Sequence, residues 1–337
     1  MYIIRLLNHK MQEANSRNFS IDVLKCLAAL LITNSHMEVL YGKYNYLATG
    51  GCIGDALFFF ISGFTLFLKP MEGVTSFPDW YKKRINRIYP SLIAVAFLGA
   101  LFFNVHRDVI DIALAKGYWF VSCIMLYYVG IYFVGSYCKD KIFVVSLLVA
   151  IGTAIWFSFE CHETGFSIYG RHYYIRWLLF FMFMLWGAKV GMLTDKIKIN
   201  PLLDFVKLLL YIAIFYGLFI CGTRFNNLVV FQYFSFMPLL CIMYYCYKVC
   251  ASKISERIYR SRAGSFVIRF VGGLCLEIYI VQGFLFTDKM NSLFPLNILI
   301  MFLVIFVVAY LTKCLARFLL ETFKDSHYDW GRIFSLY

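Results

Sequence analysis

Residues 27–42 of the chain read LAALLITNSHMEVLYG, and they place a histidine, His36, inside an apolar stretch typical of a membrane interior. In the whole chain of 337 residues, 61% are hydrophobic and 15% are charged. Soluble domains are about half apolar and roughly a quarter charged. This composition therefore excludes a soluble globular protein, and it predicts an all-α, polytopic membrane protein.

Long apolar stretches recur along the whole sequence, and about 20 such residues suffice to cross a bilayer core. They cover residues 21–42, 52–68, 88–105, 117–137, 141–159, 173–193, 202–222, 227–250, 266–286 and 295–320. We therefore expect ten transmembrane helices in one domain, 1–337. The first segment carries charged residues in its first turns and has no small-residue cleavage site, so we interpret it as a retained helix rather than a signal peptide.

The distribution of basic residues predicts the orientation in the membrane. The chain has 32 Lys and Arg against 19 acidic residues. An inward N-terminus places most of them in the cytoplasm, including Arg5, Lys10 and Arg17 and the loops 69–87 and 248–262. Loops rich in Lys and Arg stay inside, so we expect both termini to be cytoplasmic. We assign this charge to membrane lipids and not to nucleic acid, because basic loops beside membrane spans bind anionic head groups.

Three ionisable residues in the first segment form a candidate site, because charge inside a bilayer is costly and usually functional. His36 follows Lys25 by 11 residues, which puts the two side chains on one helical face about 16 Å apart. Asp22 lies about 40° to the other side of that face. A buried imidazole stays neutral and can act as a general base toward a hydroxyl. The alternative is a histidine that only hydrogen-bonds a neighbouring helix.

Two further motifs follow in the second and third segments. Arg84 and Arg87 in RINR are three residues apart, so they share one helical face and can grip phosphate oxygens bidentately; a purely topological role is the alternative. Ser62 in FFFISGF, residues 58–64, is either a small packing residue or a nucleophile. Arg176 and Glu277, in later segments, either pair across the bundle or line an acceptor cavity.

These motifs together resemble the membrane-bound acyltransferase-3 family, whose members O-acylate bacterial surface sugars. The resemblance rests on Lys25, ten residues and then His36, on FFFISGF at 58–64, and on RINR at 84–87. YWFVSCIMLYY at 118–128 and FFMFMLWGAKVG at 180–191 look like later family blocks. LCLEIYIVQGFLF at 274–286 departs from the family pattern, because Gln282 stands where members often have a histidine.

The resemblance implies an acyl-CoA donor, most simply acetyl-CoA, and an acceptor that is a cell-envelope glycan or a lipid-linked sugar. It also implies a bacterial cytoplasmic membrane location. Arg84, Arg87 and Lys25 would then hold the donor, and His36 would act as base with Asp22 in support. Direct transfer and a covalent intermediate both remain open at this point.

Two rival functions stay open at the level of sequence. A transporter or flippase could use Asp22, His36, Arg176 and Glu277 as a substrate or proton path, although no internal repeat supports alternating access. A catalytically inactive relative acting as a sensor would explain Gln282. We expect no metal, because the polar loop 159–174 matches no helical His-x-x-x-His spacing.

Overall fold

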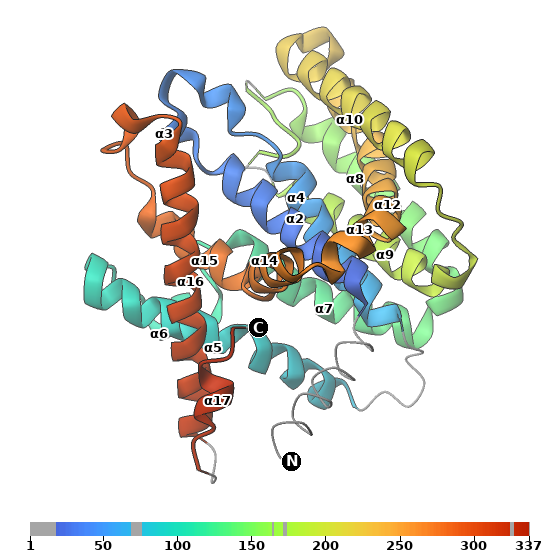
Figure 1. Ribbon diagram of the computed structural model, residues 1–337. Coiled ribbons are helices and arrows are strands. Elements are labelled where there is room, and N and C mark those ends of the chain that lie inside the picture. Colours follow the sequence, from blue (N-terminus) through green and yellow to red (C-terminus); the bar gives the residue numbers. More distant parts are fainter. Residues whose placement is uncertain (1–17, 69–75, 164, 171–173, 324–326, 337) are drawn as a thin grey trace.

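The structure is a computed structural model that describes residues 18–68, 76–163, 165–170, 174–323 and 327–336. Within these ranges the regular elements are all helices (Figure 1), which confirms the expected all-α class. The N-terminal charges Arg5, Lys10 and Arg17, on which part of the orientation argument rests, lie outside the described residues.

The first half of the bundle is built on four long helices with short connecting turns. Its elements are α2 (Phe19–Ser35), α3 (Glu38–Tyr41), η1 (Gly42–Leu47), α4 (Gly51–Phe67), α5 (Phe77–Phe103), α6 (Val109–Ala113), α7 (Trp119–Tyr137) and η2 (Lys139–Lys141). The Asn18 side chain caps α2 by accepting a hydrogen bond from the Ser20 amide at 3.1 Å. Gly50, with φ of +96°, reverses the chain before α4 in a conformation that favours glycine.

The second half adds the helices that enclose the first. Its elements are α8 (Ile142–Glu160), α9 (Ile175–Met192), η3 (Thr194–Lys196), α10 (Pro201–Arg224), η4 (Asn226–Leu228), α11 (Val230–Phe234), α12 (Phe236–Cys250), α13 (Lys253–Arg260), α14 (Arg262–Gly273), α15 (Cys275–Leu285), η5 (Asn291–Leu293), α16 (Leu296–Thr322) and α17 (Trp330–Ile333). In the view of Figure 1, α16 stands at one edge of the bundle and α10 with α12 at the other, with α2 and α4 between them.

The described residues do not confirm the count of ten membrane spans that the apolar stretches suggest. Among the described residues, seven helices are long and apolar enough to cross a membrane, or up to nine if each of two bent helix pairs counts as one span. The bent pairs are α2 with α3 and η1, at 61°, and α14 with α15, at 70°. α4 is apolar but has only 17 residues. Long apolar runs therefore predicted the segments but not their straightness or length.

The first expected segment, 21–42, breaks at His36. α2 ends at Ser35, and His36 is its C-terminal cap, with its amide bonded to the Thr33 carbonyl. The Asn34 side chain donates hydrogen bonds to the Leu47 and Thr49 carbonyls, at 2.9 and 3.0 Å. These bonds tie the chain that follows the bend back to the end of α2.

Glycines let α4 approach α2 and α9 at backbone distance. A methyl group at Gly63 would overlap the Met184 carbonyl oxygen, and one at Gly187 would overlap the Phe60 carbonyl oxygen. On the other side, a methyl group at Gly54 would lie 2.6 Å from the Ile32 side chain. Small residues at helix contacts are the usual way in which membrane helices associate. Gly63, which follows Ser62 in the FFFISGF run, is therefore a packing residue.

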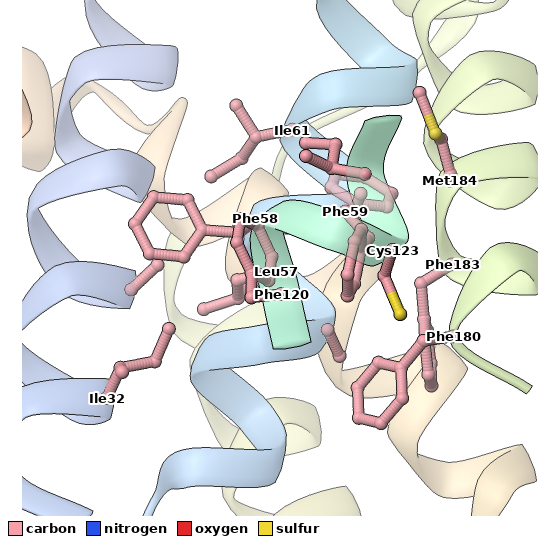
Figure 2. Packing of buried hydrophobic residues seen from close by; sticks show 14 of the residues in the cluster. Ile32, Leu57, Phe58, Phe59, Ile61, Phe120, Cys123, Phe180, Phe183 and Met184 are labelled. Carbon is pink, nitrogen blue, oxygen red and sulfur yellow. The ribbon is translucent and has the colours of Figure 1, made fainter. Parts of the chain in front are cut away.

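Aromatic side chains fill the core beside this contact. Phe59 is fully buried and lies 4.5 Å from Phe120 and 5.7 Å from Phe180, measured between ring centroids. Figure 2 shows these rings with Phe183 and Met184 between α4, α7 and α9. Tilted aromatic pairs at such distances add packing energy beyond the area that they bury. The core thus holds α4 in a fixed position between α2 and α9.

We predict that Gly187→Val lowers the stability of the protein by more than about 1–3 kcal/mol, because the new side chain must push α9 off the α4 backbone. The measurement is the thermal unfolding midpoint in detergent, together with the monodisperse fraction on size exclusion. Gly217→Val is the matched control, because nothing lies within 4 Å of the corresponding position on α10. Equal behaviour of the two variants would contradict the close contact.

Candidate active site

A cavity of about 470 Å³ lies between α2, α4, α5, α7, α14, α15 and α16. Five basic side chains line it: Lys25, Arg84, Arg87, Lys313 and Arg317. A volume of this size falls in the range of small-molecule sites, which is roughly 300–1,000 Å³. The predicted donor-binding residues Arg84, Arg87 and Lys25 are therefore brought together in one site, joined by two cations from α16.

The arginine pair of α5 marks one end of the cavity, which we call the basic end. Arg84 is half-buried, and its guanidinium lies 4.6 Å from the Trp80 ring and 5.7 Å from the Tyr128 ring. Its Nε is buried and has no hydrogen-bond partner among the described residues. Arg87 is exposed on the next turn. A buried guanidinium nitrogen without a protein partner can donate a hydrogen bond to an acceptor group of a ligand.

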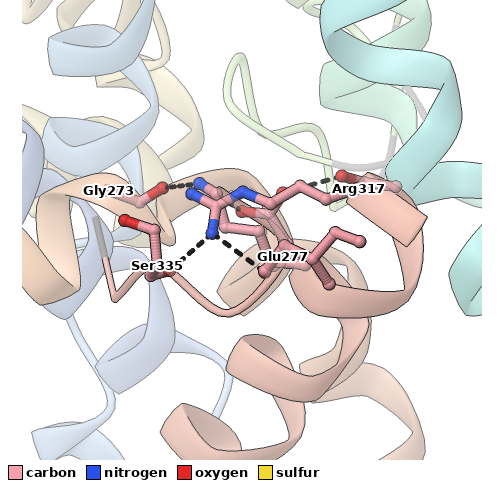
Figure 3. Close-up of polar contacts among 7 residues, drawn as sticks. Gly273, Glu277, Arg317 and Ser335 are labelled. Atoms are coloured by element: carbon pink, nitrogen blue, oxygen red, sulfur yellow. Dashed lines mark hydrogen bonds and ion pairs between the residues drawn. The ribbon is translucent and has the colours of Figure 1, made fainter. Parts of the chain in front are cut away.

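A buried carboxylate lies farther along the same cavity. Glu277 on α15 is 4% exposed, and its Oε1 accepts a hydrogen bond from Ser91 Oγ at 2.7 Å. Its Oε2 lies 3.7 Å from Lys313 Nζ, which itself donates to the Gly273 carbonyl. Figure 3 shows Gly273 and Glu277 beside Arg317, whose guanidinium donates to the Ser335 carbonyl. Glu277 is thus paired with Lys313 and lines the cavity, so of the two alternatives left open by the sequence, lining a cavity holds for Glu277.

Aromatic rings form the other end of the cavity, which we call the aromatic end. Phe58, Phe120 and Tyr279 line it, and the Phe120 ring lies 5.6 Å from each of the other two. The Phe120 amide donates to the Tyr279 hydroxyl at 3.4 Å. On α7, Tyr128 beside Arg84 and Phe120 are eight residues apart, which is about 12 Å of helix. The cavity therefore changes from cationic to apolar along its length.

The three ionisable residues predicted on one face of the first segment lie in three different environments. Lys25 lines the cavity, whereas Asp22 is 2% exposed and its Oδ2 accepts a hydrogen bond from Tyr259 at 3.0 Å. His36 is half-buried at the bend and is not among the residues that line the cavity. Because α2 is one continuous helix as far as Ser35, His36 lies roughly 16 Å beyond Lys25 along its axis. The catalytic role of His36 stays a prediction.

The remaining sequence candidates occupy different environments. Ser62 lines the cavity, but its hydroxyl donates to the Phe58 carbonyl at 2.9 Å. The guanidinium of Arg176 stacks on the Trp119 ring at 3.9 Å, outside the cavity wall. Gln282 is buried, and its Oε1 has no hydrogen-bond partner among the described residues. The Ser62 hydroxyl is thereby bonded to its own helix.

Sequence reasoning missed several residues of the site. Lys313 and Arg317 stand four residues apart on α16, and a lysine inside so apolar a segment was a signal that could have been used. Asp55 gave the same signal in α4; it does not line the cavity, but it interacts electrostatically with Tyr279, which does. Ser91 carried no signal, because a serine in an apolar helix usually bonds its own backbone.

Metal binding finds no support in the described ranges, where no group of three His, Cys, Asp or Glu side chains could hold a metal ion. In the polar loop 159–174, Glu160 accepts a hydrogen bond from Trp156 at 2.7 Å. Arg171 and His172 of that loop lie outside the described residues.

Comparison with known proteins supplies the family. A family model described as an acyltransferase domain, that of acyltransferase-3, matches residues 18–315. The chain belongs to the acyltransferase-3 family. No curated protein and no solved structure matches it.

Membership in the acyltransferase-3 family indicates which reaction the cavity serves. The matched range of this acyltransferase-3 member begins just before α2 and ends within α16, so it includes Lys25, Arg84, Arg87, Glu277 and Lys313. An acyltransferase activity and an integral membrane location follow from the family and the many apolar helices. The basic cavity is therefore the candidate active site of a membrane acyltransferase.

The position of α2 beside the cavity depends on Tyr259 of α13. The Tyr259 hydroxyl donates to Asp22 and accepts a hydrogen bond from Arg269 Nε, each at 3.0 Å. We expect Tyr259→Phe to lower stability by about 1.5–3 kcal/mol, the range for a hydrogen bond to a charged group. Tyr328→Phe, which removes an exposed hydroxyl bonded to Thr322, is the control in the same thermal unfolding measurement.

Tyr259 also predicts a pH dependence of stability. Burial, and then the nearby Asp22 carboxylate, raise the pKa of Tyr259 above its ordinary value of 10.0. The unfolded phenol ionises near pH 10 and the folded one only above it, so its contribution is complete below pH 10 and is lost as the pH rises through the folded pKa. Wild type should therefore lose more stability above pH 10 than Tyr259→Phe does. An equal loss in both proteins would contradict this prediction.

Proposed function

We propose that the protein is an O-acyltransferase that moves an acetyl group from acetyl-CoA to a hydroxyl of a cell-envelope polysaccharide or of a lipid-linked glycan. The observation that carries the proposal is the basic cavity of an acyltransferase-3 member, with the unpartnered Nε of Arg84 at its basic end. In the predicted orientation this end faces the cytoplasm, where coenzyme A is found. The proposed location is the bacterial cytoplasmic membrane.

The residues fit the chemistry of coenzyme A as a cosubstrate. Its phosphates are anionic, and guanidinium groups bind phosphate oxygens with bidentate geometry. Arg84 and Arg87 would hold them, with Lys25 and Arg317 adding positive charge along the wall. The thin arm that ends in the thioester would then extend toward the apolar aromatic end. Desolvation inside the cavity strengthens each of these electrostatic contacts.

The transfer step assigns a proton to His36. The acceptor hydroxyl oxygen attacks the thioester carbonyl carbon, the carbon–sulfur bond breaks, and the sulfur leaves as the thiolate of coenzyme A. The hydroxyl proton passes to the His36 imidazole. Because His36 does not line the cavity, this step requires the acceptor to approach from the bend at the end of α2. Asp22 and Lys25 support this geometry by fixing α2, and Arg176, Gln282 and the rings of the aromatic end lie on the acceptor side. Because Ser62 donates to its own helix, we do not route the transfer through it.

His36→Ala tests the proposed base. We expect transfer of labelled acetyl from acetyl-CoA to a host glycan extract to fall by about 10²–10⁴-fold, which is the usual contribution of a general base. Expression and the unfolding midpoint must match those of wild type. Undiminished transfer in the variant would exclude the histidine mechanism. Wild type that transfers no acetyl group would redirect the assay to glycan transport, the rival function.

Arg84→Gln and Arg87→Gln test the donor site. We expect each to raise the KM for acetyl-CoA about tenfold, because one charge-assisted contact to phosphate is worth roughly 1.5–3 kcal/mol and 1.4 kcal/mol is a factor of ten. The matched control is Lys82→Gln, which removes an exposed charge from the same helix outside the cavity wall. A KM that responds equally to all three changes would show only an effect of net charge.

A further inference from the structure

Glu277 is the one acidic residue among those that line the basic cavity of the described chain. An anionic cosubstrate gains nothing from a carboxylate in its binding site, and a buried charge costs free energy unless it has partners. Glu277 therefore needs an explanation other than phosphate binding.

The hydrogen bonds of Glu277 leave one oxygen available. Oε1 is satisfied by Ser91 Oγ at 2.7 Å. Oε2 is buried and has no hydrogen-bond partner among the described residues, because Lys313 Nζ is 3.7 Å away and donates to the Gly273 carbonyl. Lys313 balances the charge of Glu277 without occupying Oε2. A carboxylate oxygen only accepts hydrogen bonds, so Oε2 is built to receive an N–H or O–H donor from a ligand.

The position of Glu277 indicates which part of the donor it meets. Ser91, its hydrogen-bond partner, follows Arg87 by four residues and Arg84 by seven on α5, hence about 6 and 10 Å farther along the helix. Tyr279, two residues after Glu277, belongs to the aromatic end. Glu277 thus lies between the place of the phosphates and the place of the thioester. The pantetheine arm of coenzyme A occupies this interval, and it is uncharged and carries two amide N–H groups.

We propose that Glu277 is a specificity-determining residue whose Oε2 accepts a hydrogen bond from an amide N–H of the pantetheine arm. Ser91 and Lys313 hold the carboxylate in place for this contact. The negative charge also keeps the phosphates at the basic end, because it opposes any anion that moves deeper. The inference rests on the proposed use of coenzyme A, but it concerns binding and does not require that transfer occurs.

The test compares two ligands, coenzyme A and a fragment of it that lacks the pantetheine arm. Titration calorimetry on the detergent-purified full chain measures the Kd of coenzyme A and of adenosine 3′,5′-bisphosphate, which has phosphates but no pantetheine arm. We expect Glu277→Ala to weaken coenzyme A binding about tenfold, whereas the bisphosphate binds as tightly as to wild type or more tightly. Glu277→Gln, which keeps an acceptor oxygen, should weaken coenzyme A binding less than Glu277→Ala does.

Two comparisons separate this role from a structural one. Glu321→Gln removes another buried carboxylate of the bundle, one that pairs with Arg332 outside the cavity wall, and it should change neither Kd. Arg84→Gln should weaken both ligands, since it acts on the phosphates. If Glu277→Ala does not fold, Ser91→Ala takes its place: it frees Oε1 and loosens the carboxylate, so it should weaken coenzyme A binding by a smaller factor and leave the bisphosphate unchanged.

The outcomes distinguish a failure of the proposed role of Glu277 from a failure of the proposed acetyl transfer. An unchanged or lower Kd for coenzyme A in Glu277→Ala would overturn it, and so would an equal loss for coenzyme A and the bisphosphate. If Glu277→Ala weakens only coenzyme A binding, as predicted, but wild type transfers no acetyl group, the proposed transfer is refuted and the role of Glu277 stands. Wild type that binds neither ligand would refute both.

Discussion

The structure depends on the close approach of α4 to α2 and α9 inside an apolar bundle. A membrane interior gives helices no hydrophobic reason to associate, so contact must come from fitted surfaces. Gly63 and Gly187 provide it by letting the α4 and α9 backbones meet, and Gly54 does the same toward α2. With α4 fixed in this way, Phe58 and Ser62 form one wall of the cavity, opposite α5, α15 and α16.

The positions of the charged side chains in the bundle follow from the lack of water in a membrane interior. An ionised group inside must find partners or a ligand. Asp22 accepts a hydrogen bond from Tyr259, whereas Glu277 accepts one from Ser91 and is paired with Lys313. Arg84 stacks on two aromatic rings and keeps a buried nitrogen without a partner. Among the residues that the structure describes, the cavity lining thus changes from cationic through a single carboxylate to aromatic, and this order would suit the proposed donor.

Particular residues show how far the sequence could predict the site. Arg84 and Arg87 were placed on one helical face by their spacing alone, and the structure confirms that face on the cavity wall. Lys25 was singled out by the cost of its charge inside a membrane, and its grouping with the two arginines came only from the resemblance to the family. The grouping of His36 with Lys25 assumed a continuous helix, and the bend after Ser35 removed His36 from that wall. Asn34 holds that bend through bonds to residues more than twelve positions away, which no periodicity reveals.

By itself the sequence determined that the protein is helical and membrane-embedded, because hydrophobicity and length are local properties of a chain. It also determined the family, because short motifs with suitable spacing survive in the linear order. Only the tertiary structure decided which charges meet. Ser91 and Glu277 are 186 positions apart, and Asp22 and Tyr259 are 237 apart. Such pairs form because helices that are distant in the chain pack side by side, and the identity of the neighbour depends on the shape of the whole bundle.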